Sequence, residues 1–170
     1  MNTNYTFFSK IIIFIVALFS MNGAQAQNGS LDLTFDSDGK VTTHAASKEA
    51  EAQSILLQKD GKIIVAGYRG APENDMVLVR YNENGSLDKS FDTDGIVTTA
   101  ISGSNVRAYS VALQNDGKIL AAGSSSIGVT EVMILVRYNI NGSLDTSFNH
   151  TGILTSAIGG VFTEVYAIAI

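Results

Sequence analysis

The chain of 170 residues contains no cysteine. That absence excludes disulfide bonds, thiolate metal sites and a lipid-modified cysteine. The sequence also has no cluster of lysine and arginine, and its formal net charge is −5. Proteins that bind nucleic acid carry a basic patch, so this composition argues against a nucleic-acid partner. A chain without cysteine folds equally well in an oxidising compartment.

Signatures of common catalytic and metal sites are absent as well. No Gly-x-Ser-x-Gly motif occurs, and the two histidines, His44 and His150, lack neighbours at the spacing of zinc ligands. The run from Ser124 to Ser126 is typical of a loop, and no glycine-rich segment opens a helix to hold phosphate. We therefore assign no catalytic residue and no cofactor-binding residue, and favour a non-enzyme.

The first 26 residues differ from the rest. Lys10 precedes an apolar run from Ile11 to Phe19, and Ala24-Gln25-Ala26 follows. This order predicts a secretory signal peptide over residues 1–26. The run is shorter than the roughly 20 apolar residues of a membrane-spanning helix, so we expect no span after cleavage. The mature chain would carry a net charge of 10 − 16 = −6, and we expect it in the periplasm or outside a bacterial cell.

A five-residue motif, Asn-Gly-Ser-Leu-Asp, organises residues 27–170. Its three copies begin at residues 28, 84 and 141, spaced by 84 − 28 = 56 and 141 − 84 = 57 residues. The motif Gln-x-Asp-Gly-Lys-Ile begins at residues 58 and 114. Fixed spacing of this length indicates an array of one supersecondary unit. Aligned with the second unit, the third stops inside a strand, so we expect about two and a half units and a fragment.

Apolar and β-branched runs of strand length alternate with clusters of Gly, Asn and Asp, and no window after the signal peptide keeps a helical period. Asp-Gly at 60–61 and 116–117 predicts two-residue hairpins with positive φ at both positions. Asn-Gly at 84–85 and 141–142 predicts turns of the same chemistry. The predicted strands are residues 40–44, 53–58, 62–68, 76–81, 96–101, 109–114, 118–123, 132–138, 153–158 and 166–170.

These features predict an all-β fold of tandem four-stranded antiparallel units. A small sheet cannot bury both of its faces alone, so the units must pack face to face. Arranged radially they form a β-propeller, of which this chain would supply about two and a half blades; a β-sandwich or a β-solenoid is the alternative. We expect the recurring leucine and phenylalanine of each unit to be buried: Leu31, Phe35, Leu87, Phe91, Leu144 and Phe148.

The pattern Asn-Gly-Ser-Leu-Asp-x-Ser/Thr-Phe-Asp-x-Asp-Gly is followed by Gln-x-Asp-Gly-Lys-Ile and then by Leu-Val-Arg-Tyr-Asn. Its copies run over residues 28–39, 84–95 and, in decayed form, 141–152. In this order the segments resemble the delta-60 repeat family of secreted bacterial β-propeller proteins. The resemblance implies a secreted or surface-associated repeat protein and implies no reaction.

Two acidic pairs are weak calcium candidates: Asp36 with Asp38, and Asp92 with Asp94. Carboxylates two residues apart can converge on a hard cation, but the bidentate glutamate of an EF-type loop is missing from both. The third copy has lost both carboxylates. Asp and Asn also cap turns, and we favour that interpretation.

Arg80 and Arg137 occupy the same place in successive units. One interpretation is a ring of arginines that binds an anionic ligand. The other pairs each arginine with Asp88 or Asp145 and packs the following tyrosine between sheets. Recurrence in each unit favours the structural interpretation, because binding sites in repeat arrays lie in variable insertions.

We therefore predict an exported, non-enzymatic repeat protein that gives a binding or scaffolding surface to a protein or glycan partner. The alternatives are the N-terminal part of a propeller enzyme with its site in further blades, and a calcium-dependent adhesin. Apart from calcium we expect no cofactor. We also expect self-association through an open C-terminal strand edge.

Overall fold

The computed structural model describes residues 29–45, 49–70, 74–101, 103–158 and 163–170. The predicted signal peptide lies outside these ranges. The chain divides into two compact units, Met1–Ser30 and Leu31–Ile170, and the second contains all the strands. Within the described ranges, no helix has the length and apolar character needed to cross a membrane.

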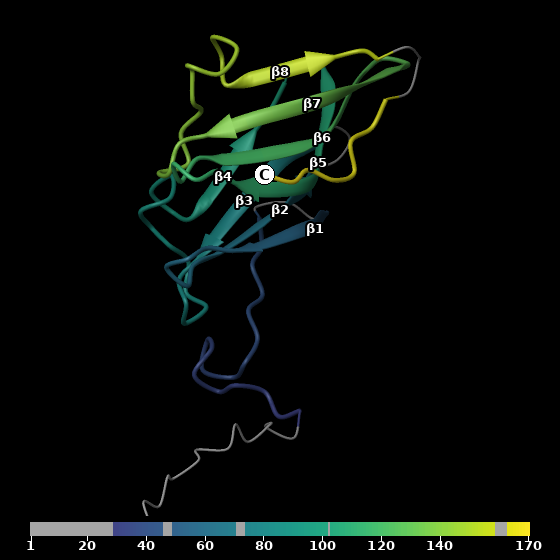
Figure 1. Ribbon diagram of the computed structural model, residues 1–170. Coiled ribbons are helices and arrows are strands. Elements are labelled where there is room, and N and C mark those ends of the chain that lie inside the picture. The colour runs from purple at the N-terminus through teal and green to yellow at the C-terminus, as the bar shows by residue number, and fades with distance from the viewer. Residues whose placement is uncertain (1–28, 46–48, 71–73, 102, 159–162) are drawn as a thin grey trace, which may run out of the picture. The chain divides into compact units, whose positions relative to one another are not determined.

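Two four-stranded sheets form the second unit (Figure 1). In the first sheet, antiparallel neighbours follow chain order: β1 (Ala50–Leu57), β2 (Ile63–Arg69), β3 (Asp75–Tyr81) and β4 (Ile96–Thr99). The second sheet repeats this order with β5 (Ser104–Leu113), β6 (Ile119–Ile127), β7 (Thr130–Tyr138) and β8 (Ile153–Ser156). The prediction of an all-β array of four-stranded antiparallel units is confirmed.

Two predicted strands are irregular in the structure, residues 40–44 and 166–170. A strand needs a hydrogen-bonded neighbour, and in the described part of the chain no ladder reaches either segment. The Asn-Gly-Ser-Leu-Asp motif lies between the third and fourth strands of each sheet, at 84–88 and 141–145. Each sheet thus takes three strands ahead of the motif and one behind it.

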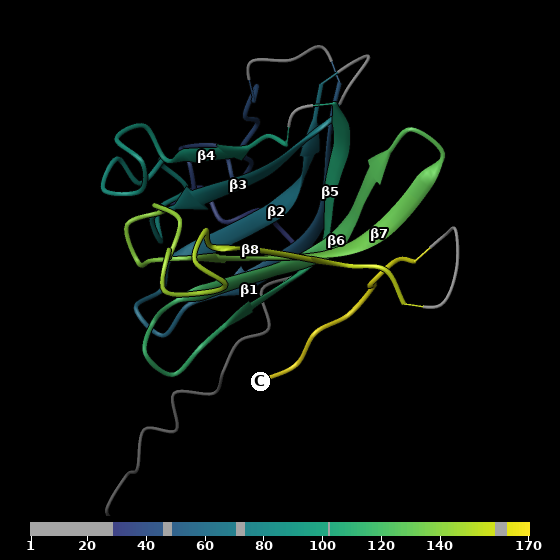
Figure 2. The same cartoon turned by 90° about the horizontal axis from the view of Figure 1, so that it is seen from above.

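Strand β3 of the first sheet is buried on both faces, since successive side chains of a strand point to opposite faces and consecutive residues of β3 are buried. One face meets the second sheet, whose β5 contacts β1, β2 and β3 (Figure 2). The buried side chains of this core come from both sheets: Ile64, Met76, Leu78, Phe91, Val106, Ile119, Ile134, Val136 and Tyr138. The other face packs Val77 and Val79 against Ala45, with Leu87 beside them.

The predicted burial of the recurring apolar residues holds for Phe91, which is fully buried. Three others are only partly buried, Phe35, Leu87 and Phe148, and the prediction is wrong for two leucines. Leu31 is 51% exposed and Leu144 is 36% exposed. Each of these side chains faces the glycine that closes its own turn rather than the core. A Cβ added to Gly39 would lie 2.6 Å from the Cβ of Leu31, and one added to Gly152 would lie 3.0 Å from that of Leu144.

One set of hydrogen bonds joins successive parts of the array. The bonds occur in three equivalent pairs. Tyr81 Oη donates to Thr43 Oγ1 at 2.7 Å, and Tyr138 Oη is bonded to Thr99 Oγ1 at 2.6 Å. Asp36 N donates to Asn84 O and Asp92 N to Asn141 O, both at 2.9 Å, while Val111 N donates to Ser54 Oγ and Ile168 N to Ser110 Oγ, both at 3.2 Å. Residues 31–45 therefore contact the first sheet in the same way that β4 and the turn before it contact the second sheet. In the same way, residues 163–170 contact β5 at the position equivalent to the one where β5 contacts β1.

A bulge in the first strand of each sheet brings two backbones close together. The register shifts between Ala52 and Ser54 in β1, and between Ala108 and Ser110 in β5. The residue opposite the second bulge is Gly123, where an added Cβ would lie 1.9 Å from the carbonyl oxygen of Arg107. Only glycine fits such an approach, since a side chain would have to push the strands apart.

We expect Gly123→Ala to lower the free energy of unfolding several times more than Gly128→Ala. Gly128 lies at φ +63° with nothing within 4 Å of an added Cβ, so alanine there bears only the strain of a positive φ. Alanine at position 123 must displace backbone. Urea unfolding of both variants measures the difference, and equal losses of stability would contradict the close approach.

Candidate functional site

The hairpin turns differ in one respect from the sequence prediction. Between β1 and β2, Gln58 N donates to Lys62 O at 2.8 Å and Gly61 N donates to Gln58 O at 3.1 Å. The loop thus has three residues rather than two, and only its glycine has a positive φ, of 81°. This is the three-residue hairpin in which a turn is followed by a glycine bulge. The turn between β5 and β6 makes the same two bonds.

The four acidic calcium candidates all lie in turns. Asp36 and Asp92 each have a φ of 47°, a conformation that aspartate tolerates better than most residues. Asp38 Oδ1 accepts the backbone N–H of residue 40 at 2.9 Å, and Asp94 Oδ1 that of residue 96 at 2.8 Å. Within the described ranges, no group of three or more His, Asp or Glu is placed to hold a metal ion. Calcium binding at either pair stays a prediction.

A buried ion network ties three segments of the first sheet together. Arg80 Nε donates to Asp88 Oδ2 at 2.7 Å, and Lys62 Nζ lies 2.9 Å from the same oxygen. Ser90 Oγ donates to Asp88 Oδ1 at 2.7 Å and accepts from Arg80 Nη2 at 3.1 Å. The guanidinium carbon lies 4.5 Å from the centre of the Phe91 ring. Strand β3, the first hairpin and the motif loop are thereby fixed to one another.

The second sheet contains the same network. Arg137 Nε and Lys118 Nζ lie 2.7 and 2.9 Å from Asp145 Oδ2, and Ser147 Oγ donates to Asp145 Oδ1 at 2.7 Å. The predicted pairing of the two arginines with these aspartates is confirmed, and Tyr138 is packed between the sheets as expected. Sequence reasoning missed the lysines, although the recurrence of Gln-x-Asp-Gly-Lys was a signal for them.

The network sets the charge of both aspartates. Burial raises the pKa of Asp88, but bonds from Lys62 and Ser90 and the charge of Arg80 outweigh burial and hold the pKa well below its usual range. For Asp145 the bond from its serine partner is the largest cause, followed by that from its lysine, and the pKa is again far below the usual range. Both carboxyls are therefore ionised at any physiological pH.

A groove runs beside the first network, between the two sheets. It has a volume of about 560 Å³ and lies where the β1–β2 and β5–β6 turns meet the loop after β7. All but one of its lining residues are of polar type, although much of the surface they expose is side-chain carbon: Gln58, Asp60, Lys62, Arg80, Ser90, Asp116, Lys118, Asn139, Ile140, Asn141 and Ser143. A hollow of about 290 Å³ adjoins it, shares Gln58, Asp60 and Ile140, and extends to Gln114. The volume lies within the range of small-molecule sites.

Two equivalent side-chain oxygens beside this groove are unpaired. Gln58 Oε1 and Gln114 Oε1 are buried, and neither has a hydrogen-bond partner among the described residues. A buried carbonyl without a donor is unfavourable by about 1–3 kcal/mol. Because both oxygens are buried, a ligand in the groove could bond to either one only after a rotation of its amide group. No sequence motif had marked the groove as a site.

Comparison with known families bears on both sheets. A family model described as "Domain of unknown function (DUF5122) beta-propeller" matches residues 58–91 and 114–148. These segments begin at the two Gln-x-Asp-Gly-Lys turns and contain both ion networks. The chain carries β-propeller repeats. The two sheets are consecutive blades, and the groove lies between them. None of the curated proteins matches the chain.

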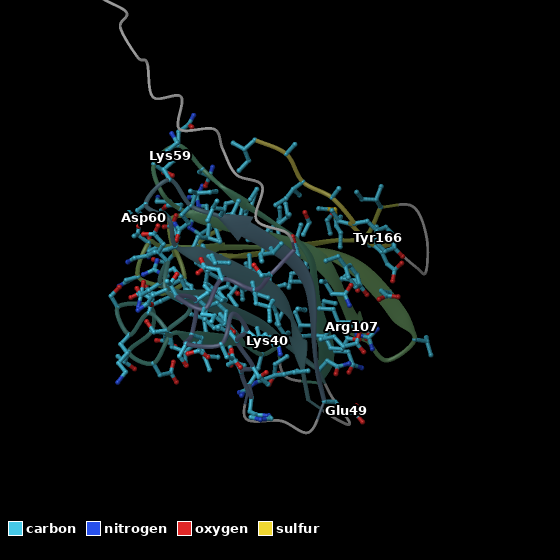
Figure 3. The ribbon with its side chains drawn as sticks, turned by 90° about the horizontal axis from the view of Figure 1, so that it is seen from below. Lys40, Glu49, Lys59, Asp60, Arg107 and Tyr166 are labelled. Atoms are coloured by element: carbon cyan, nitrogen blue, oxygen red, sulfur yellow. The ribbon has the colours of Figure 1, made fainter. Side chains whose placement is uncertain are left out.

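A second polar surface lies at the opposite end of the blades, where Figure 3 labels Arg107 and Tyr166 across the molecule from Lys59 and Asp60. The guanidinium carbon of Arg107 lies 5.0 Å from the centre of the Tyr68 ring. Tyr166 stacks on the Tyr109 ring at 5.4 Å. Tyr166 also bonds to Glu164, so these groups largely satisfy one another.

The remaining sequence candidates are not brought together. His44 and His150 are exposed, and His150 lies in a turn with a φ of 62°. The run Ser124 to Ser126, expected in a loop, belongs to β6 instead, since it pairs with residues 131–133 of β7. Ser124 Oγ donates to Glu131 at 2.7 Å, and no histidine lies in its described surroundings to act as a base.

We expect Asp88→Asn to lower the free energy of unfolding at pH 7 by roughly 3 kcal/mol, because Arg80 loses its buried partner. A carboxyl with a lowered folded-state pKa stabilises the fold above the unfolded-state pKa of about 3.9, and this stability is lost as the pH falls below it. The wild-type stability should therefore decrease from about pH 5 towards pH 2, and the variant should show a shallower decrease.

Urea unfolding at a series of pH values measures both effects. The matched control is Glu83→Gln, since Glu83 is exposed and lies outside the network. We expect Glu83→Gln to keep the wild-type dependence of the free energy of unfolding on pH. If the free energy of unfolding of Asp88→Asn fell with decreasing pH as steeply as that of the wild type, the network would not be what holds this carboxyl ionised.

Proposed function

We propose that the chain is an exported, non-enzymatic propeller protein that gives a binding surface outside the cytoplasm. The observation that carries this proposal is the groove between the blades, whose walls are fixed by the ion network and by inter-blade hydrogen bonds. A rigid polar groove suits recognition, because little ordering is needed when a ligand binds.

The chemistry of the groove supports binding rather than catalysis. The cations that line it are held by aspartates, as Lys62 and Arg80 are by Asp88. The hydroxyl of Ser90 donates to Asp88 at 2.7 Å and accepts from Arg80. The strongly lowered pKa of Asp88 makes this carboxylate a weak base, whereas activation of a serine nucleophile needs a base able to take its proton.

Export is the second part of the proposal, and it rests on residues 1–26 of the sequence. A single cation, an apolar run and Ala24-Gln25-Ala26 follow one another in the order of a signal peptide. We further propose that the repeats are of the delta-60 type, because three motif segments recur in that order. We therefore propose a periplasmic or cell-surface location for the protein.

Cell fractionation in a bacterial host tests the export. We expect the wild-type chain outside the cytoplasm with an N-terminus at Gln27, whereas Ile13→Asp, which interrupts the apolar run, should leave an uncleaved chain inside. Cytoplasmic, uncleaved wild-type protein would contradict the proposal.

Sedimentation of the purified protein with isolated bacterial cell envelopes tests the binding surface. We expect the wild type to sediment with the envelopes and the groove variant Ile140→Asp to remain in the supernatant. The matched control is Tyr166→Ala, at the other end of the blades, and it should sediment like the wild type. Equal sedimentation of all three proteins would remove the groove from the proposed function.

A further inference from the structure

The inter-blade groove has a nearly balanced charge. Four cationic side chains line it and the adjoining hollow: Lys59, Lys62, Arg80 and Lys118. Two aspartates line it as well, Asp60 and Asp116, and two more bind its cations directly, Asp88 and Asp145. Arg137 shares Asp145 with Lys118, so five positive charges lie beside four negative charges and the groove is close to neutral. A ligand with a large net charge of either sign gains little there, because charges of both signs lie close together.

The exposed carboxylates of Asp60 and Asp116 offer hydrogen-bond acceptors to the groove, and each uses Oδ1 to accept the backbone N–H two residues on, at 3.3 and 3.1 Å. Gln58 Oε1 and Gln114 Oε1 are unpaired among the described residues but buried, so a rotation of the amide group would bring either one to a ligand. A ligand with hydroxyl groups can donate to such acceptors and accept from the lysines that line the groove.

One apolar side chain interrupts this polar surface. Ile140 is 57% exposed and lines both the groove and the adjoining hollow. Its backbone is held in place, since Arg80 Nη1 donates to its carbonyl oxygen at 2.6 Å. An isoleucine between two polar hollows offers a contact for a ligand that has a C–H face as well as hydroxyl edges.

We propose that the groove between the two blades binds a neutral oligosaccharide. This inference rests on the proposed function, since it names the ligand class of the proposed binding surface. Sugar rings combine hydroxyl donors at the edge with an apolar C–H face, and they carry no charge. Two adjoining hollows on either side of Ile140 suit two linked rings better than one.

The test is a titration of the full mature chain with maltotriose, cellotriose and chitotriose in turn, followed by calorimetry and by backbone amide NMR. We expect at least one trisaccharide to bind and to shift the amide signals of Asn115 and Ile140. Gln58→Leu and Ile140→Ser should each weaken binding by about tenfold, as the loss of one ligand contact does. Tyr166→Ala should leave the affinity unchanged.

Because Gln58 is half-buried, the affinity of Gln58→Leu is compared with that of the wild type only if the two proteins have similar melting temperatures. The exposed Ile140 gives a second variant that does not depend on this condition. No signal change with any trisaccharide would overturn the proposal, as would shifts confined to Tyr166 and its neighbours. Binding of polygalacturonate alone would overturn the neutral class.

The outcome separates this inference from the proposed function. If sedimentation with envelopes depends on Ile140 but no trisaccharide binds, the groove is still the binding surface and its ligand is not a neutral oligosaccharide. Failure of export or of sedimentation removes the proposed function itself.

Discussion

The bond between Arg80 and Asp88 is the interaction on which the first blade depends. Their 2.7 Å contact joins the end of β3 to the motif loop, and Lys62 brings the first hairpin to the same carboxylate. The loop that this bond holds delivers Phe91 to the core between the blades. It also delivers β4, which completes the sheet. Without this ion pair, the loop between β3 and β4 would be held in position only by the hydrogen bonds of its own turns.

Stacking of the blades changes the surroundings of this network. The Arg80 side chain is 3% exposed because the next blade covers it and supplies the Ile140 carbonyl, whereas the Arg137 side chain is 21% exposed. The two networks have the same internal distances. The pairing is therefore a property of one repeat, and its burial is a property of two. This division explains why the pattern could be recognised within a single unit.

Most of the strands, the positions of the turns and the arginine pairs could be predicted from the sequence, because each depends on residues close in the chain or on period-two alternation. Leu31 shows where this reasoning stops, since the same residue type in the same motif is exposed there and packed at Leu87. Residues 40–44 have strand composition but no ladder partner. Burial and pairing depend on neighbours that are distant in the chain, and a local pattern does not report them.

The groove was beyond sequence reasoning for a related reason. Its residues come from two blades, and most are repeat residues with a structural task, such as the turn-capping Asp60 and Asp116. Ile140 is different, because the equivalent place in the preceding repeat is Glu83. Each lies near the glycine of its own hairpin: a Cβ added to Gly61 would lie 3.3 Å from Glu83, and one added to Gly117 would lie 3.0 Å from Ile140.

The backbone at this place is thus constant while the side chain varies. Repeat residues can build the walls of an inter-blade groove, and the variable residue can decide what the groove accepts. A glutamate there would add a charged group to the groove and remove its apolar contact. An isoleucine adds no charge and offers a C–H contact, which suits a neutral, hydroxyl-rich ligand.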